Sequence, residues 1–172
     1  MSIDTQNALF EFAVGYLSKH RCGSLHVTWY GGESLLAKDV IFDLSLRFID
    51  YCDANSVSYS ANMISNGYLL DKKLAQRLST DCMIKQVQIT VDGTAEHHNK
   101  RRVLKSGEKN YSVILENIGE CKEYMEVIVR VNIDKRNVSE LSSLWQVVVE
   151  NKWESNPRIF WLLFLIIQNV VI

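Results

Sequence analysis

The sequence predicts an α/β domain built on a parallel sheet, and two observations carry this prediction. Short runs of strand-forming residues alternate along the chain with longer segments whose apolar residues recur at helical spacing. Strands that alternate with helices pair as parallel neighbours through right-handed crossovers. The chain has 172 residues, 47% of them hydrophobic and 23% charged, which suits one domain with a sizeable core. An open doubly wound sheet and a full or partial barrel both satisfy this order, and both bind ligands at the carboxyl ends of their strands.

The expected helices each carry an apolar stripe. The first contains Leu9 to Leu17 and follows Asp4 and Thr5, which could cap it. The remaining helices are expected at 38–54, from Asp71 through Leu78, near 111–124 and near 138–151.

Four strands are expected between these helices, at 25–30, 57–64, 86–91 and 127–133. Each ends in a polar or glycine-rich signal, and in a parallel sheet all four signals lie on one edge: Gly31-Gly32-Glu33, Ser65-Asn66-Gly67, Asp92-Gly93, and Asn132 with Asp134. Adjacent glycines let the backbone approach a ligand closely. A carboxylate such as Glu33 could hold an ammonium group, and Asn66 offers both donors and acceptors. The sequence therefore predicts a ligand site at this edge.

Each signal alone has a simpler explanation. A Gly-Gly-Glu triplet is typical of a turn with an acid near a helix N-terminus, and Asn-Gly and Asp-Gly are turn formers. His97 and His98 have no third ligand at a suggestive spacing, so a solvated pair is favoured over a metal site. The run from Lys100 to Arg102 is explained equally well as a solvated basic face.

The order of five motifs says more than each one alone. WYGGESLL at 29–36 resembles the "WFGGEPLL" segment of radical S-adenosylmethionine (SAM) enzymes, and ISNGYLL at 64–70 resembles their "ITNGTLL" segment. QITVDG at 88–93, followed by HNKRR at 98–102, is similar to the family segment "ISIDG…HDxxR". YSVILENI at 111–118 resembles the helix that follows this segment in the family. RVNID at 130–134 matches "VRVNID". The resemblance covers about 25–144. It is closest to the branch that modifies peptides and proteins, which includes the anaerobic sulfatase-maturing enzymes and members with a SPASM extension.

This resemblance implies a partial (β/α)6 barrel in which a CxxxCxxC loop after the first strand holds a [4Fe–4S] cluster. SAM chelates the cluster and is cleaved to a 5′-deoxyadenosyl radical, which abstracts hydrogen from a peptide or protein substrate. The positions of this chain that match the family's SAM contacts are Gly31, Gly32 and Glu33 for the methionine amino group, Asn66 near the SAM site, Thr90 as a hydroxyl donor, Arg102 facing the SAM carboxylate, and Arg130 and Asn132 lining the pocket. The resemblance assigns no catalytic residue and no metal ligand to this chain.

The cysteines depart from the family pattern. Cys22, Cys52, Cys82 and Cys121 lie no closer than 30 positions apart, and a cluster needs three thiolates on its loop. The first strand and its cysteine loop would lie before Ser2, so we expect 1–158 to be an incomplete radical SAM core, a fragment that is inactive alone. The alternatives are a cluster-free module that binds SAM or a peptide together with a partner, and a generic α/β domain whose motifs arose by chance. Two milder departures are Ser34 for the usual proline and Asn99 for the usual aspartate.

The apolar run 159–172, IFWLLFLIIQNVVI, is set apart as a tail of uncertain status. It is shorter than the roughly 20 residues that a membrane span needs, and it could be the next buried strand. The net charge of −1 favours neither nucleic acid nor a membrane as partner. Scattered thiols and an N-terminus without signal-peptide features lead us to expect a cytoplasmic protein.

Overall fold

The computed structural model describes residues 1–104 and 107–165. One five-stranded sheet contains β1 (Ser24–Trp29), β2 (Ser58–Ser65), β3 (Ile84–Thr90), β4 (Glu126–Ile133) and β5 (Ile159–Leu165). The strands lie in sequence order and every neighbouring pair is parallel. The helices are α1 (Ile3–His20), α2 (Lys38–Ala54), α3 (Lys72–Asp81), α4 (Ala95–Arg101), α5 (Tyr111–Cys121) and α6 (Leu141–Glu150), with short 3-10 helices η1 (Ser34–Ala37) and η2 (Val138–Glu140). The predicted α/β class is confirmed.

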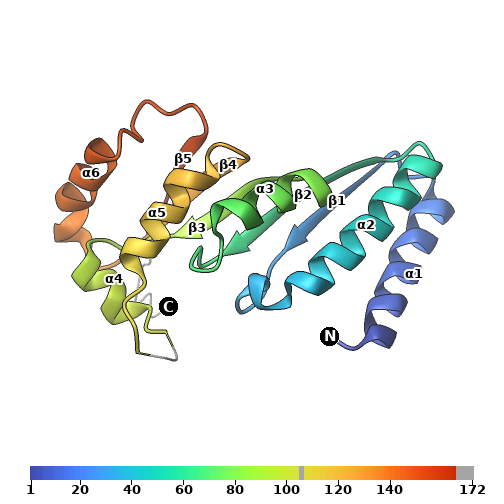
Figure 1. Ribbon diagram of the computed structural model, residues 1–172, viewed down its shortest axis with the longest axis horizontal. Coiled ribbons are helices and arrows are strands. Elements are labelled where there is room, and N and C mark those ends of the chain that lie inside the picture. Colours follow the sequence, from blue (N-terminus) through green and yellow to red (C-terminus); the bar gives the residue numbers. More distant parts are fainter. Residues whose placement is uncertain (105–106, 166–172) are drawn as a thin grey trace, which may run out of the picture.

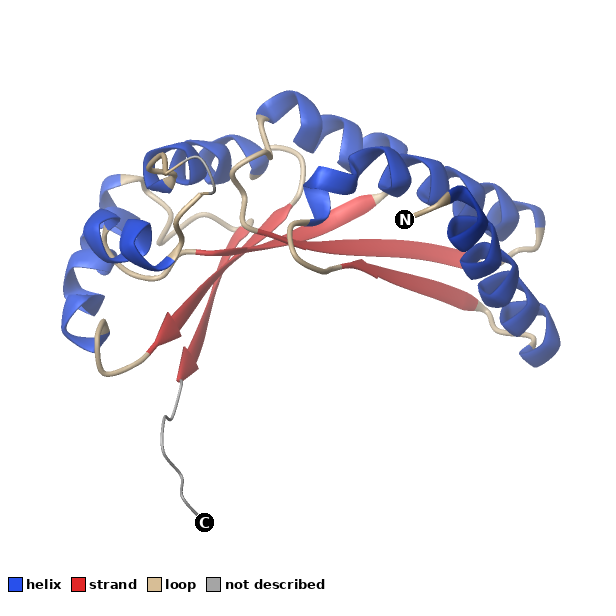
Figure 2. Cartoon of the chain, turned by 90° about the horizontal axis from the view of Figure 1, so that it is seen from below, coloured by secondary structure: helices blue, strands red, loops and turns tan. Residues whose placement is uncertain are grey.

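The helices lie along one side of a curved sheet, and Figure 2 shows no helix of the described chain over the other side. A doubly wound sheet reverses its strand order and carries helices on both faces. Here the order runs one way, from β1 to β5, so the architecture is that of a partial barrel.

The strand sequences explain this one-sided arrangement. Positions that face the helices are apolar and fully buried, as are Val87 and Ile89 in β3 and Val129 in β4. Most alternate positions on the uncovered face are polar and partly exposed, as are Gln88 and Arg130. In a parallel sheet covered on both faces, each strand is a continuous apolar run. The alternation of apolar and polar residues seen here instead leaves one face for water or a ligand.

Several predicted boundaries change in the structure. Ser2 caps α1 by accepting a hydrogen bond from the backbone N–H of Thr5 at 3.2 Å, so the cap expected at Asp4 and Thr5 is wrong. Asp71 does cap α3, accepting from Leu74 N–H at 2.7 Å. The helix α4 was not predicted, because its seven residues, AEHHNKR, are too few and too polar to show an apolar stripe.

The fifth strand comes from the apolar run at the end of the chain. β5 pairs with β4 over seven positions, from Val127↔Ile159 to Ile133↔Leu165. Residues 159–165 therefore continue the sheet, while the rest of the run, 166–172, lies outside the described residues. Within the described part, no helix is both long and apolar enough to cross a membrane.

A candidate ligand site at the carboxyl edge of the sheet

A cavity of about 210 Å³ opens where the strands end. Its walls come from the ends of β1, β2, β3 and β4 and from the residue after α4: Tyr30, Gly32, Ile64, Ser65, Asn66, Thr90, Arg102, Arg130 and Asn132. Six of the eight predicted site residues lie in this wall. The other three wall residues, Tyr30, Ile64 and Ser65, lie within the motifs at 29–36 and 64–70 but were not predicted as site residues.

A second, larger recess of about 610 Å³ adjoins this cavity. It shares Gly32 and Asn66 with the cavity and adds Glu33 together with a mainly apolar set of side chains: Leu36, Tyr68, Leu69, Val103 and Leu104. The two spaces together offer a polar end and an apolar end. Gly31, at φ 128°, lines neither of them but forms the turn that brings Gly32 to both.

Sheet register brings the polar side chains of the cavity together. Thr90 and Arg130 are direct Cα partners across β3 and β4, so their side chains leave the same face. The Arg130 Nε–H donates to Oδ1 of Asn132 at 2.9 Å. Thr90 and Asn132 are 8% and 7% exposed, so a ligand that reached them would be largely shielded from water.

The Glu33 carboxylate is engaged within the chain. Its Oε1 accepts hydrogen bonds from the Ser65 hydroxyl at 2.8 Å and from Leu35 N–H at 3.0 Å, and its Oε2 accepts from Asn66 N–H at 2.7 Å. Glu33 thus ties the turn after β1 to the end of β2. Contact of this carboxylate with a ligand ammonium stays a prediction.

Asn66 is held in a tight turn. Its backbone N–H is bound by Glu33, and its Oδ1 accepts from Tyr68 N–H at 2.8 Å. Gly67 follows with φ +80°, a backbone conformation that glycine adopts without strain. A Cβ added there would lie 2.8 Å from Ile89 Cγ2, so glycine is needed both for the turn and for its approach to β3.

The thiols do not suit a cluster. Cys52, Cys82 and Cys121 are buried. Burial raises the pKa of the Cys82 thiol to about 11 and that of Cys121 to about 12, so both stay protonated and poor as ligands. Among the described residues, no three His, Cys, Asp or Glu side chains are grouped as a metal site would require. A [4Fe–4S] cluster does not fit the residues that the structure describes.

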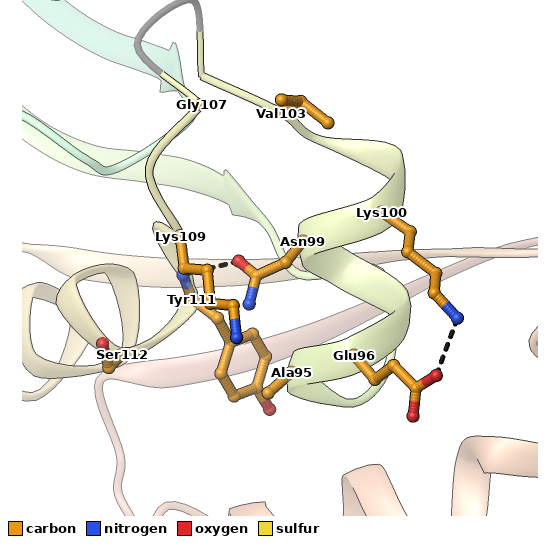
Figure 3. Close-up of a pocket in the computed structure, with 9 residues that line it drawn as sticks. All are labelled: Ala95, Glu96, Asn99, Lys100, Val103, Gly107, Lys109, Tyr111 and Ser112. Carbon is orange, nitrogen blue, oxygen red and sulfur yellow. Dashed lines mark hydrogen bonds and ion pairs between the residues drawn. The ribbon is translucent and has the colours of Figure 1, made fainter.

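A larger cavity lies elsewhere, between α4 and the start of α5, with a volume of about 830 Å³ (Figure 3). Asn99 forms part of its wall and uses its Oδ1 to accept from the N–H groups of Asn110 and Tyr111 at 3.1 and 3.2 Å. Lys100 in the same wall pairs with Glu96 at 2.7 Å. None of the predicted site residues lines this cavity, so volume alone does not identify the site.

The one-way parallel sheet with helices along one side is an α/β fold that matches solved structures of radical SAM enzymes. The chain is similar to solved structures of anSMEcpe, an anaerobic sulfatase-maturating enzyme of the radical SAM class. Native anSMEcpe with bound AdoMet (S-adenosylmethionine) matches with a TM-score of 0.74 at 18% identity, over 92% of this chain and 42% of that one. The form with bound AdoMet and Kp18Cys peptide matches with a TM-score of 0.75 at 17% identity, over 98% and 44%.

These comparisons confirm the predicted resemblance at the level of the fold. The chain spans less than half the length of the structures that it matches. No family model and no curated protein matches it.

Proposed function

We propose that this chain is the SAM-binding part of a radical SAM core that serves peptide or protein modification. The observation that carries the proposal is the convergence of six family-matched residues, from the ends of β1 to β4 and from the residue after α4, on one cavity at the carboxyl edge. Two solved structures of the same fold, in which anSMEcpe holds AdoMet and a peptide, support both the ligand and the class of substrate.

The donor set of the cavity suits the amino-acid end of SAM. The guanidinium groups of Arg102 and Arg130 can bind a carboxylate through charge-assisted hydrogen bonds. Thr90 adds a hydroxyl, and Gly32 lets the backbone come close to the ligand. The adjoining apolar recess suits the less polar part of the ligand.

When bound in a complete radical SAM enzyme, SAM supplies the 5′-deoxyadenosyl group that abstracts hydrogen from the substrate. The residues of this chain bind and orient SAM and exclude water from one end of it. This chain binds SAM and carries out no redox step, because the described thiols do not suit a cluster. Alone, the chain is proposed to be inactive.

A second candidate is a cluster-free module that binds SAM or a peptide for a partner protein. The apolar recess favours it, because Leu36 and Val103 at its rim are 78% and 65% exposed and could contact an apolar peptide side chain. Binding of an apolar peptide in the absence of SAM, lost in Leu36→Ser, would distinguish this candidate.

The test is a titration of the full chain with SAM, monitored by ligand-observed NMR. We expect a dissociation constant on the order of 1 mM, about −4 kcal/mol, because pairs that water can reach are worth only about 1 to 4 kcal/mol each. Arg130→Gln should weaken binding at least about fivefold. Lys19→Gln, which removes an equal charge from the exposed last turn of α1, should leave it unchanged. Equal effects of the two variants, or no binding at all, would overturn the proposal.

A further inference from the structure

We infer that Asp92 is the positioning residue of the carboxyl-edge cavity, setting the orientation of Arg102, Asn132 and, through Asn132, Arg130. Only the identity of the ligand rests on the proposed function. Asp92 lies two residues beyond β3 and is 2% exposed, and it is not among the residues that line the cavity. It therefore acts through its neighbours.

One carboxylate binds two cavity residues that come from different elements. Its Oδ1 accepts from the backbone N–H of Asn132 at 3.1 Å and from Asn132 Nδ2 at 2.9 Å. Its Oδ2 accepts from Arg102 Nε–H at 2.9 Å. Hydrogen bonds to an ionised, buried carboxylate are about twice as strong as neutral ones, so both partners are held firmly.

The contact with Asn132 also decides which end of its amide faces Arg130. An ionised carboxylate only accepts hydrogen bonds, so the NH2 end of Asn132 must face Asp92. The oxygen end then faces the other way and accepts from Arg130 Nε–H at 2.9 Å. Asp92 thus orients the second guanidinium of the cavity through one intervening side chain.

The backbone of Asp92 is itself fixed. Its N–H donates to Nδ1 of His98 at 3.2 Å, and His98 is completely buried, so the solvated pair expected for His97 and His98 is wrong. Arg101 approaches the same Oδ2 with its Nε at 3.8 Å. These contacts place the carboxylate before any ligand arrives, as a positioning role requires.

Asp134 provides a matched control. It lies just beyond β4, as Asp92 lies just beyond β3, and it is also buried, at 6% exposure. Its Oδ1 accepts from Arg136 N–H at 2.8 Å, and its Oδ2 lies 3.0 Å from Arg136 Nη2 and 3.2 Å from Arg101 Nη2. Neither arginine lines the cavity, and Arg101 is the most distant of the groups around Asp92, at 3.8 Å, so loss of the Asp134 carboxylate should leave the bonds of Asp92 to Arg102 and Asn132 in place.

The experiment compares Asp92→Asn with Asp134→Asn in the full chain through two readouts. Without ligand, hydrogen exchange of Arg102 Nε–H, measured by ¹⁵N NMR, should be slow in the wild type and in Asp134→Asn. In Asp92→Asn it should be at least about tenfold faster, because an amide cannot accept from both partners as the carboxylate does. With SAM as the probe, Asp92→Asn should weaken binding about tenfold or more, and Asp134→Asn less than about twofold.

Retained slow exchange in Asp92→Asn, or an equal loss of SAM binding in both variants, would overturn the inference. If Asp92→Asn does not fold, Asn132→Ala decides, since it should speed exchange of Arg130 Nε–H while Arg102 Nε–H stays protected. Faster exchange at both arginines, or at neither, would overturn the inference. If the wild type binds no SAM, the proposed function fails, while the exchange data still decide the role of Asp92.

Discussion

At the residue scale, Glu33 shows how a side chain that a motif assigns to a ligand is used by the fold. We predict that Glu33→Ala lowers the free energy of unfolding by about 1 to 3 kcal/mol, because three donors lose their shared acceptor. Urea unfolding measures this loss, with Glu11→Ala on the exposed side of α1 as the control. A Glu33→Ala variant as stable as the wild type would show that these hydrogen bonds contribute nothing to the free energy of unfolding.

His98 makes stability depend on pH. Burial, assisted by the charge of Arg102, lowers its pKa from 6.5 to about 4. Between these values the unfolded chain binds the proton and the folded chain does not, so stability falls as the pH decreases from about 6.5 to 4. A shift of this size corresponds to a loss on the order of 3 kcal/mol.

Denaturation at several pH values tests this dependence on His98. The slope of stability against pH in this window should flatten in His98→Gln and persist in His20→Gln, since His20 lies exposed at the end of α1. The same slope in the wild type and in His98→Gln would assign the dependence to other groups.

At the element scale, the connection from β2 to α3 depends on Gly67. We predict that Gly67→Ala costs at least about 2 kcal/mol, because left-handed backbone costs roughly 1 to 2 kcal/mol and the added Cβ meets buried Ile89. Gly107→Ala is the matched control, since Gly107 has the same φ of +80° and no atom of the described residues lies within 4 Å of an added Cβ. Thermal unfolding of both variants separates the two contributions, and equal losses would contradict a role for the contact with Ile89.

The elements that the sequence predicted well share one property. The first four strands alternate apolar and polar residues, and their predicted ends agree with the structure within two residues. The fifth strand has no such alternation, so its continuous apolar run left a strand and a tail equally open. The carboxyl-end rule correctly predicted that these residues gather at one edge, where six of the eight line one cavity, while SAM binding there stays a prediction. The bonds of Glu33 with Ser65 and of Asp92 with Asn132 were not predictable, because these partners lie 32 and 40 positions away and only the register of the sheet brings them together.

At the scale of the whole molecule, the distribution of cysteines predicts that iron and sulfide yield no stable [4Fe–4S] centre on this chain. The three buried thiols have raised pKa values, and Cys22 is the only cysteine that is not buried. Absorbance in the charge-transfer band and EPR after reduction are the readouts, and Cys22→Ser tests for adventitious iron. A stoichiometric cluster with the matching EPR signal would contradict the account of the thiols.

The central claim is that SAM binds at the carboxyl edge of the sheet. Its most direct test is an amide chemical-shift map of the full chain with SAM up to roughly 10 mM, about ten times the expected dissociation constant. We predict that the largest chemical-shift changes occur at the amides of Gly32, Asn66 and Asn132. The amide signals of Gly23 and Ser58, at the opposite edge of the sheet, should not shift. Shifts centred on the cavity between α4 and α5, shifts at the opposite edge, or no shifts at saturating SAM would contradict it.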